Sequence, residues 1–176
     1  QRLLTPHRTM LPTTVNIHEI LERVRSLLTA EFPQTLSVIR DYDTSLPDLI
    51  GDREQLIQAV LNIGRNAAQA IGGMAEGPDG GGRIVLRTRA ARQVTLAKRR
   101  YRLALELQVV DNGPGIPESI RERMFFPLVS GREGGSGLGL TLAQSFVQQH
   151  QGTIEVESKK NGGSSFIVKL PLTVQY

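Results

Sequence analysis

Two glycine clusters in residues 111–140 constrain the fold of this chain more than any other feature. The clusters consist of Gly113 and Gly115, then of Gly134, Gly135, Gly137 and Gly139. A strand-like run, residues 105–110, ends at Asp111, and the second cluster leads into an apolar, helix-like segment at Leu138. Glycine lets the backbone approach a ligand closely, and free N–H groups at a helix start attract anions. The stretch therefore predicts a phosphate-bearing ligand held between an acid and a helix N-terminus.

Two upstream segments have the periodicity and the boundary residues of amphipathic helices. Asn16 and Asp52 each precede a run with apolar residues at helical spacing, and each is followed three residues later by Glu or Gln. This pattern is typical of a capping box. We expect one helix to begin after Asn16 and to end before Pro33. We expect the other to run from Asp52 to about Ile71.

A third helix is predicted downstream of the second glycine cluster. It starts at Leu138 and ends near His150, with Gly152 as its stop signal. We expect His150 to interact as a cation with the C-terminal end of the helix dipole.

Alternating apolar residues predict strands over residues 36–42, 84–88, 103–110, 153–157 and 166–170. Residues 93–102 are expected to connect two antiparallel strands, and the last two strands form a hairpin. This order favours an α/β two-layer sandwich, with helices on one face of a mixed, largely antiparallel sheet. A doubly wound parallel fold does not fit, because the hairpins are antiparallel.

Several common classes of protein are excluded by absent motifs. The chain has no Gly-Lys pair, which a P-loop requires, and the second glycine cluster lacks the GxGxxG register. It has no Cys, so it has no disulfide framework or thiolate metal site. No apolar run approaches the ~18 residues of a membrane span, so we expect no membrane contact and a cytoplasmic location.

Length and termini suggest the domain organisation. The 176 residues suit one domain. Residues 1–15 are expected to be a connector from an upstream domain, because they contain prolines and begin at Gln1 without a Met. Residues 16–176 are expected to form the folded domain.

Two polar features each admit a functional and a structural interpretation. Asn62 and Asn66 lie four apart in the second helix and project from one face, either toward a ligand or toward solvent. Residues 98–102, KRRYR, resemble a weak nucleic-acid footprint, but a solvated hairpin is the favoured interpretation. We therefore expect no nucleic-acid partner.

The motifs together resemble the catalytic, ATP-binding domain of sensor histidine kinases, in the superfamily that includes Hsp90, gyrase B and MutL. The matching motifs are the N box at residues 62–67, two glycine boxes at 111–116 and 135–140, the F box at 125–127 and a closing glycine turn at 162–166. The resemblance covers residues 14–172 and is strongest to the nitrogen-regulation kinases. It implies the Bergerat-type ATP-binding fold.

The resemblance implies ATP and Mg²⁺ as cofactors and assigns a role to each motif. Asp111 would accept a hydrogen bond from the adenine amine, which guanine lacks, and Asn66 would offer an oxygen to Mg²⁺. Phe126 belongs to an ATP lid, and Arg65 and Arg132 would contact phosphate. The remaining nucleotide-binding residues are Gly113, Gly115, Ile116, Gly135, Ser136, Gly137, Leu138, Gly139 and Leu140.

Asn62 favours phosphotransfer over hydrolysis. The ATPases of this superfamily carry a Glu at that position, and an amide cannot replace it as general base. A histidine nucleophile needs no such base.

We interpret His18 as a structural residue of its helix. The acceptor histidine is therefore expected on a separate dimerisation domain of the same protein. An NtrC-like response regulator and a PII signalling protein are the implied partners. An ATPase or nucleotide-sensing module is the alternative.

Overall fold

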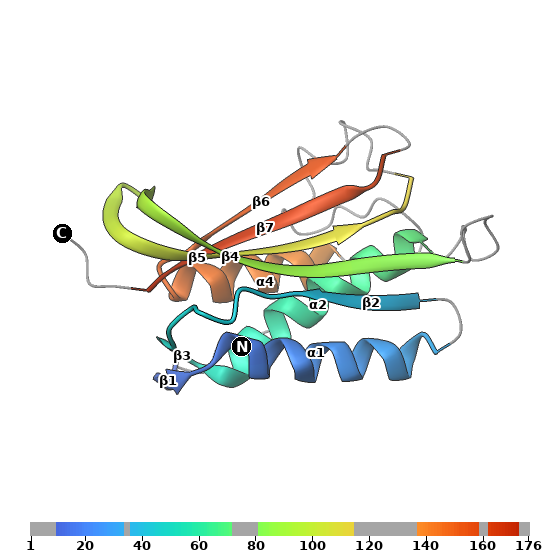
Figure 1. Ribbon diagram of the computed structural model, residues 1–176, viewed down its shortest axis with the longest axis horizontal. Coiled ribbons are helices and arrows are strands. Elements are labelled where there is room, and N and C mark those ends of the chain that lie inside the picture. The colour runs from blue at the N-terminus through green and yellow to red at the C-terminus, as the bar shows by residue number, and fades with distance from the viewer. Residues whose placement is uncertain (1–9, 34–35, 72–80, 115–136, 159–161, 173–176) are drawn as a thin grey trace.

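A computed structural model of the chain describes residues 10–33, 36–71, 81–114, 137–158 and 162–172. Within these ranges the protein is a two-layer α/β sandwich (Figure 1). Its helices are α1 (Ile17–Glu31), α2 (Arg53–Ile71) and α4 (Gly137–Gln149). Its strands are β1 (Thr13–Val15), β2 (Leu36–Asp41), β3 (Leu49–Gly51), β4 (Gly82–Leu96), β5 (Arg99–Asp111), β6 (Thr153–Ser158) and β7 (Ser164–Pro171).

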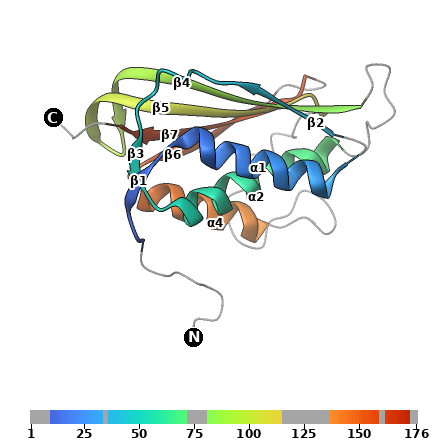
Figure 2. The same cartoon turned by 60° about the horizontal axis from the view of Figure 1, so that its bottom comes forward.

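The main sheet has the strand order β2-β4-β5-β7-β6. Only β2 and β4 pair in parallel; the other three pairs are antiparallel. All three described helices cover one face of this sheet, with α2 between α1 and α4 (Figure 2). The predicted fold class, a mixed and largely antiparallel sheet with helices on one face, is confirmed.

Both predicted helix caps are present. The Asn16 side-chain oxygen accepts from the His18 backbone N–H at 2.8 Å, and Asp52 Oδ1 accepts from the Gln55 backbone N–H at 3.1 Å. Such caps satisfy N–H groups that a helix start otherwise leaves without partners. They fix the positions where α1 and α2 begin, which places the two asparagines of α2 at defined heights along the helix.

The core lies between the sheet and the helices. Alternate residues of β5 point into it, and Leu105, Leu107 and Val109 are completely buried. The opposite sheet face is polar, and on it Arg87 and Arg89 both contact the Asp41 carboxylate. This alternation is that of a sheet with one face covered. None of the described helices combines the length and apolarity needed to cross a membrane.

Residues 93–102 are not the connector that the sequence predicted. β4 continues to Leu96, β5 begins at Arg99, and only Ala97 and Lys98 turn the chain, both with positive φ (51° and 70°). Two-residue hairpin turns of this kind usually carry Asn-Gly or Asp-Gly. Ala-Lys gives no such signal, so the turn and the strands beside it escaped prediction.

Gly152 ends α4 for a different reason from the one expected. The left-handed residue after the helix is Gln151, with φ of 65°, and the Gly152 N–H then donates to the Val147 carbonyl at 3.0 Å. A Cβ on Gly152 would collide with the Lys169 carbonyl oxygen in β7. The glycine is therefore required by close packing of the helix end on the sheet.

His150 is not the cation that its position at the helix end suggested. It is buried, and burial lowers the pKa of its imidazole. Its Nε2 accepts from the Asp52 backbone N–H at 2.9 Å, and its Nδ1 lies 2.8 Å from the Phe146 carbonyl oxygen. Since a backbone N–H can only donate and a carbonyl can only accept, these contacts select the neutral ring with its proton on Nδ1.

Candidate functional site

Asp111 lies at the end of β5, where it is 4% exposed. Its Oδ1 accepts from the Gly113 backbone N–H, and its Oδ2 accepts from the Ser164 hydroxyl, both at 2.8 Å. Burial raises the pKa of this carboxyl, and the hydrogen bonds from Gly113 and Ser164 oppose that rise. Within the described residues, the acid is thus held in one orientation by two neutral donors.

Ser164 is a site residue that the sequence reasoning did not single out. It opens β7, pairs with Asp111 across the sheet and is 6% exposed. The residue before it, Gly163, has φ of 80°, and a Cβ there would collide with the Asp111 carbonyl oxygen. The closing glycine turn was recognised as a motif, but only the strand pairing reveals that its serine holds the acid.

The first glycine cluster brings Asp111 against the end of α2. A Cβ added at Gly113 would lie 3.5 Å from Ile71 Cγ1 and 3.7 Å from the Ala70 carbonyl carbon, so the turn touches the last residues of the helix. Asn112 fixes the same turn, because its side-chain oxygen accepts from the Arg83 backbone N–H at 2.8 Å. The acid therefore lies beside the helix that carries the two asparagines.

Asn62 and Asn66 lie on α2 and are both half-buried. The Gln58 amide donates to the Asn62 side-chain oxygen at 3.4 Å, one turn earlier on the same face. Arg65 points elsewhere: its Nε donates to Glu31 Oε1 at 2.9 Å, at the end of α1. This ion pair is about two-fifths exposed on both sides, and such pairs contribute roughly 0–1 kcal/mol.

The first turn of α4 contains part of the second glycine cluster. Gly137, Leu138, Gly139 and Leu140 are helical, so the predicted junction between cluster and helix is confirmed. The ends of β5 and α2 and the start of α4 all lie toward one end of the molecule (Figures 1 and 2). Six predicted site residues lie outside the described part of the chain: Gly115, Ile116, Phe126, Arg132, Gly135 and Ser136.

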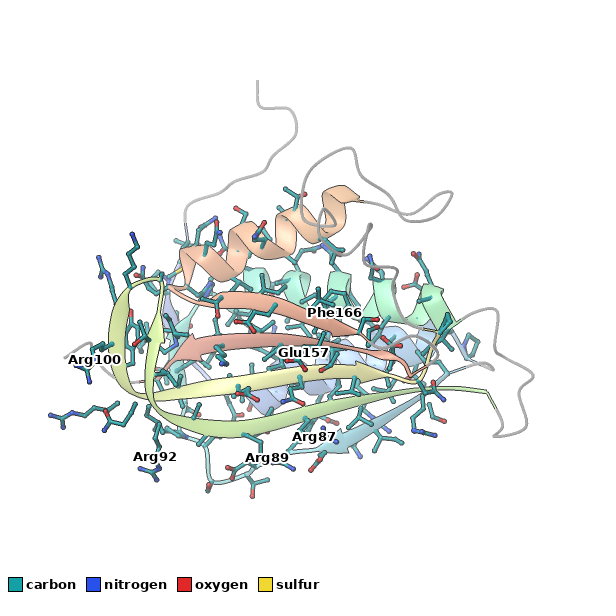
Figure 3. The ribbon with its side chains drawn as sticks, turned by 90° about the horizontal axis from the view of Figure 1, so that it is seen from above. Arg87, Arg89, Arg92, Arg100, Glu157 and Phe166 are labelled. Carbon is teal, nitrogen blue, oxygen red and sulfur yellow. The ribbon has the colours of Figure 1, made fainter. Side chains whose placement is uncertain are left out.

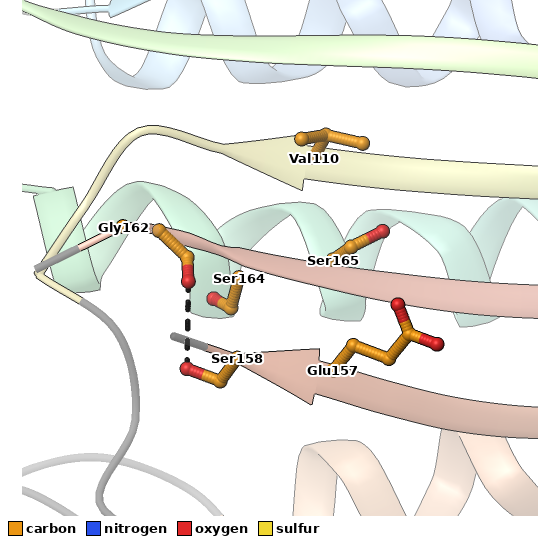
Figure 4. Close-up of a pocket in the computed structure, with 7 residues that line it drawn as sticks. Val110, Glu157, Ser158, Gly162, Ser164 and Ser165 are labelled. Carbon is orange, nitrogen blue, oxygen red and sulfur yellow. Dashed lines mark hydrogen bonds between the residues drawn. The ribbon is translucent and has the colours of Figure 1, made fainter. Parts of the chain in front are cut away.

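A small pocket of about 160 Å³ lies close to this end of the sheet, on the face without helices (Figure 4). Val110, Ser165 and Glu157 are cross-strand neighbours that line it, and the Ser158 hydroxyl donates to the Gly163 carbonyl at 3.4 Å. Asp111 points to the other side of the sheet. Ser164, whose hydroxyl holds Asp111, also contributes to the lining of the pocket.

The arrangement joins a hydrogen-bond acceptor to an anion site. The Asp111 carboxylate can accept a hydrogen bond from a ligand. The free N–H groups in the first turn of α4 can bind a negatively charged group of the same ligand. The described residues contain no cluster of three or more His, Cys, Asp or Glu side chains that could hold a metal ion. These are the binding properties expected for a nucleotide whose phosphates lie toward α4.

A sequence profile of the histidine kinase-, DNA gyrase B-, and HSP90-like ATPases matches residues 51–174. The chain belongs to this family. Membership of this family implies that the nucleotide is ATP.

Among this family, the chain is similar to the sensory histidine kinase/phosphatase NtrB. It is 50% identical over 171 residues to NtrB of Salmonella typhimurium, a match that covers 97% of this chain and 47% of that protein. It is 39% identical over 163 residues to NtrB of Rhodobacter capsulatus, covering 90% and 43%. The chain thus spans about half the length of the NtrB proteins that it matches, and the expected resemblance to nitrogen-regulation kinases is confirmed.

Solved structures of histidine kinases share the fold of this family member. The nucleotide-free catalytic domain of histidine kinase ThkA aligns with a TM-score of 0.72 at 24% identity, covering 94% of this chain and all of that domain. Full-length ShkA in complex with AMPPNP aligns with a TM-score of 0.76 at 21% identity, covering 98% and 34%. A complex of ThkA with response regulator protein TrrA aligns with a TM-score of 0.69 at 22% identity, covering 93% and 42%.

Proposed function

We propose that this chain is the catalytic domain of a sensor histidine kinase of the NtrB type, which binds Mg·ATP and donates the γ-phosphate to a histidine. The observation that carries the proposal is the buried Asp111 carboxylate at the end of β5, beside the helix that bears Asn62 and Asn66. Asp111 accepts the adenine amine, which selects ATP over GTP because guanine presents a carbonyl there.

Asn66 supplies the protein ligand for Mg²⁺. The half-buried amide fits this ion, which binds few protein oxygens and takes its other ligands from phosphates and water. When bound, Mg²⁺ neutralises charge on the transferring phosphate. Gly137, Leu138, Gly139 and Leu140 offer backbone N–H groups to the phosphates, and Gly135, Ser136 and Arg132 extend the same site. Arg65 joins it by leaving its weak pair with Glu31.

Asn62 decides between transfer and hydrolysis. Its side chain accepts from Gln58, and an amide has no basicity with which to activate water. A neutral imidazole already carries a nucleophilic lone pair, so positioning and charge neutralisation are sufficient for transfer. Rapid ATP hydrolysis, as in the ATPase members of the family, is the alternative function.

The proposed partners come from the resemblance to nitrogen-regulation kinases, and the ThkA complex with response regulator protein TrrA supports one of them, the response regulator. We place the catalytic domain at residues 16–176 and a connector at residues 1–15, although β1 already pairs Thr13–Val15 with β3. The acceptor histidine lies on a dimerisation domain of the same protein, and an NtrC-like response regulator receives the phosphate. A PII signalling protein regulates the kinase. ATP supply places these steps in the cytoplasm.

Calorimetric titration with Mg²⁺ and a non-hydrolysable ATP analogue tests the nucleotide site. Asp111→Asn keeps the size of the side chain but not the charge that accepts the adenine amine, and we expect its affinity to fall by at least about tenfold. Ser165→Ala on the opposite sheet face is the matched control. Equal affinities of wild type and Asp111→Asn would refute the adenine contact.

A phosphotransfer assay tests the reaction. A separately produced acceptor domain of an NtrB protein is mixed with this chain and γ-labelled ATP, and we expect label on histidine that Asn66→Ala abolishes. Asn62→Glu should raise phosphate release by at least about tenfold, because it adds a general base. Brisk phosphate release by the wild-type chain, without transfer to histidine, would favour the ATPase function instead.

A further inference from the structure

The positive charge of the chain is concentrated in one segment, residues 92–102, which we call the basic arm. The arm holds five of the 21 Lys and Arg residues and none of the 17 Asp and Glu residues, so the rest of the chain is close to neutral. Its cations are Arg92, Lys98, Arg99, Arg100 and Arg102. The net charge of +4 is therefore a local property of this arm.

The basic arm is the far end of the β4–β5 hairpin, which continues past the rest of the sheet (Figure 1). The pairing of β5 with β7 begins only at Ala104, and the pairing of β2 with β4 ends at Arg87. Val94, Leu96, Tyr101 and Ala104 form a small apolar cluster that stiffens the arm. All five cations are exposed, and Figure 3 shows Arg92 and Arg100 at this end of the sheet.

An open cavity of about 520 Å³ lies beside the arm. Arg99 and Tyr101 line it from the arm, and Leu49, Ile50, Pro171 and Leu172 line it from β3 and the end of β7. Ile50 is 66% exposed, which is unusual for an isoleucine beside a cavity. Met10, Gln149, His150 and Gln151 complete the lining, which is more apolar than polar. A guanidinium thus borders a largely apolar hollow that is large enough for one bulky side chain.

The combination fits a protein segment better than a nucleic acid. Single-stranded nucleic acid binds on exposed aromatic rings, but Tyr101 is only 5% exposed. The apolar cavity has no counterpart on a phosphate backbone, whereas it fits an aliphatic or aromatic anchor side chain. We propose that the basic arm and the cavity beside it dock an acidic protein segment that inserts one apolar side chain.

The docking surface is remote from the nucleotide site. Arg99 and Asp111 are at opposite ends of β5, whose length corresponds to roughly 40 Å at about 3.3 Å per residue. A partner on the arm therefore leaves the space between β5, α2 and α4 open. Docking and ATP binding are expected to be simultaneous rather than competitive, and charge complementarity should accelerate the encounter.

Fluorescence anisotropy with three labelled probes tests the proposal. The first is a 12-residue Glu-rich peptide with a central Leu-Phe pair, the second carries Ser-Ser in place of that pair, and the third is a single-stranded 12-mer DNA. The protein variants are Arg99→Glu with Arg100→Glu in the arm, Ile50→Ser at the cavity, and Arg23→Glu with Arg83→Glu as a control with the same change in net charge. Arg23 is an exposed residue of α1, and Arg83 is exposed at the opposite end of β4 from the arm.

We expect the Leu-Phe peptide to bind, and to bind the arm variant at least about tenfold more weakly, since close opposite charges steer and hold it. The control pair should change its affinity less than about twofold, because distant exposed charges are screened. Ile50→Ser and the Ser-Ser peptide should each weaken binding. ATP-analogue binding by the arm variant should match wild type, which shows that the variant is folded.

Three results would overturn the proposal. The first is that the Leu-Phe peptide does not bind. The second is that the arm pair and the control pair lose the same affinity for it. The third is that the DNA binds more tightly than the peptide and that Ile50→Ser does not change the DNA affinity. The last result would identify the arm as a nucleic-acid contact. Each outcome is independent of the phosphotransfer assay, so failure here leaves the proposed kinase function standing.

Discussion

His150 Nε2 accepts a hydrogen bond from the backbone N–H of Asp52, across 2.9 Å and 98 positions of sequence. The contact joins the last turn of α4 to the start of α2. Even a methyl group does not fit at Gly51, since a Cβ there would lie 2.9 Å from His150 Cδ2. The joint therefore depends on a neutral imidazole in a tightly packed place.

This joint predicts a loss of stability in mild acid. The folded state keeps the pKa of His150 below 6.5, so unfolding takes up a proton and the free energy of unfolding falls as pH drops below about 6.5. The slope is at most about 1.4 kcal/mol per pH unit for each imidazole. Urea unfolding of wild type between pH 7.5 and 5.5 measures it.

His18 must be included in that measurement. Burial also lowers the pKa of His18, whose Nε2 lies 2.9 Å from Thr88 Oγ1, so it contributes a slope of the same sign. His150→Gln should be less stable at pH 7.5 and should flatten the profile. Addition of His18→Gln should flatten it further, and an unchanged slope in the double variant would contradict the assignment to these two rings.

Ser164→Ala should weaken nucleotide binding indirectly, through its effect on Asp111. The hydroxyl donates to Asp111 Oδ2, and its loss leaves a buried carboxylate with one donor fewer. The hydroxyl holds the carboxylate in one orientation, and an acid that is no longer preorganised should bind the ATP analogue about tenfold more weakly. Ser165→Ala should bind normally; similar losses in both variants would indicate a general disturbance of β7.

Gly163→Ala should destabilise the fold by at least about 2 kcal/mol, because the new methyl group meets the Asp111 carbonyl at a positive φ. Chemical denaturation measures the change. Gly162→Ala is the neighbouring control, since Gly162 is exposed to solvent. A Gly163→Ala protein as stable as wild type would show that β5 and β7 can move apart.

The turn of the basic arm offers a stabilising substitution. Ala97 and Lys98 both have positive φ, which Asn and Gly adopt with less strain. Replacement of the pair by Asn-Gly should raise the free energy of unfolding by about 1 kcal/mol. Thermal or urea unfolding tests this, and a decrease would mean that Ala97 or Lys98 makes favourable contacts in the arm.

The parts of the structure that were predictable depend on neighbouring residues. Asn16 and Asp52 cap helices through contacts two and three positions away, so their patterns located α1 and α2. Asp111 was recognisable because a strand ending in an acid and glycines is a local pattern.

The parts that escaped prediction depend on distant residues or on unmarked turns. Ser164 is 53 positions from the acid that it holds, and only sheet register brings the two together. The neutral state of His150 depends on a backbone N–H that comes from another element. In the arm, Leu96 and Tyr101 are the only buried residues and most of the others are exposed, so no regular alternation marked its strands.

The buried Asp111 also links thermal robustness to function. Because burial raises the pKa of its carboxyl, the charged form at neutral pH makes the empty fold less stable than an uncharged side chain of the same shape would. A ligand that binds only the folded chain restores stability by mass action. Directed evolution of this domain for heat resistance alone would therefore be expected to discard the acid that recognises the nucleotide.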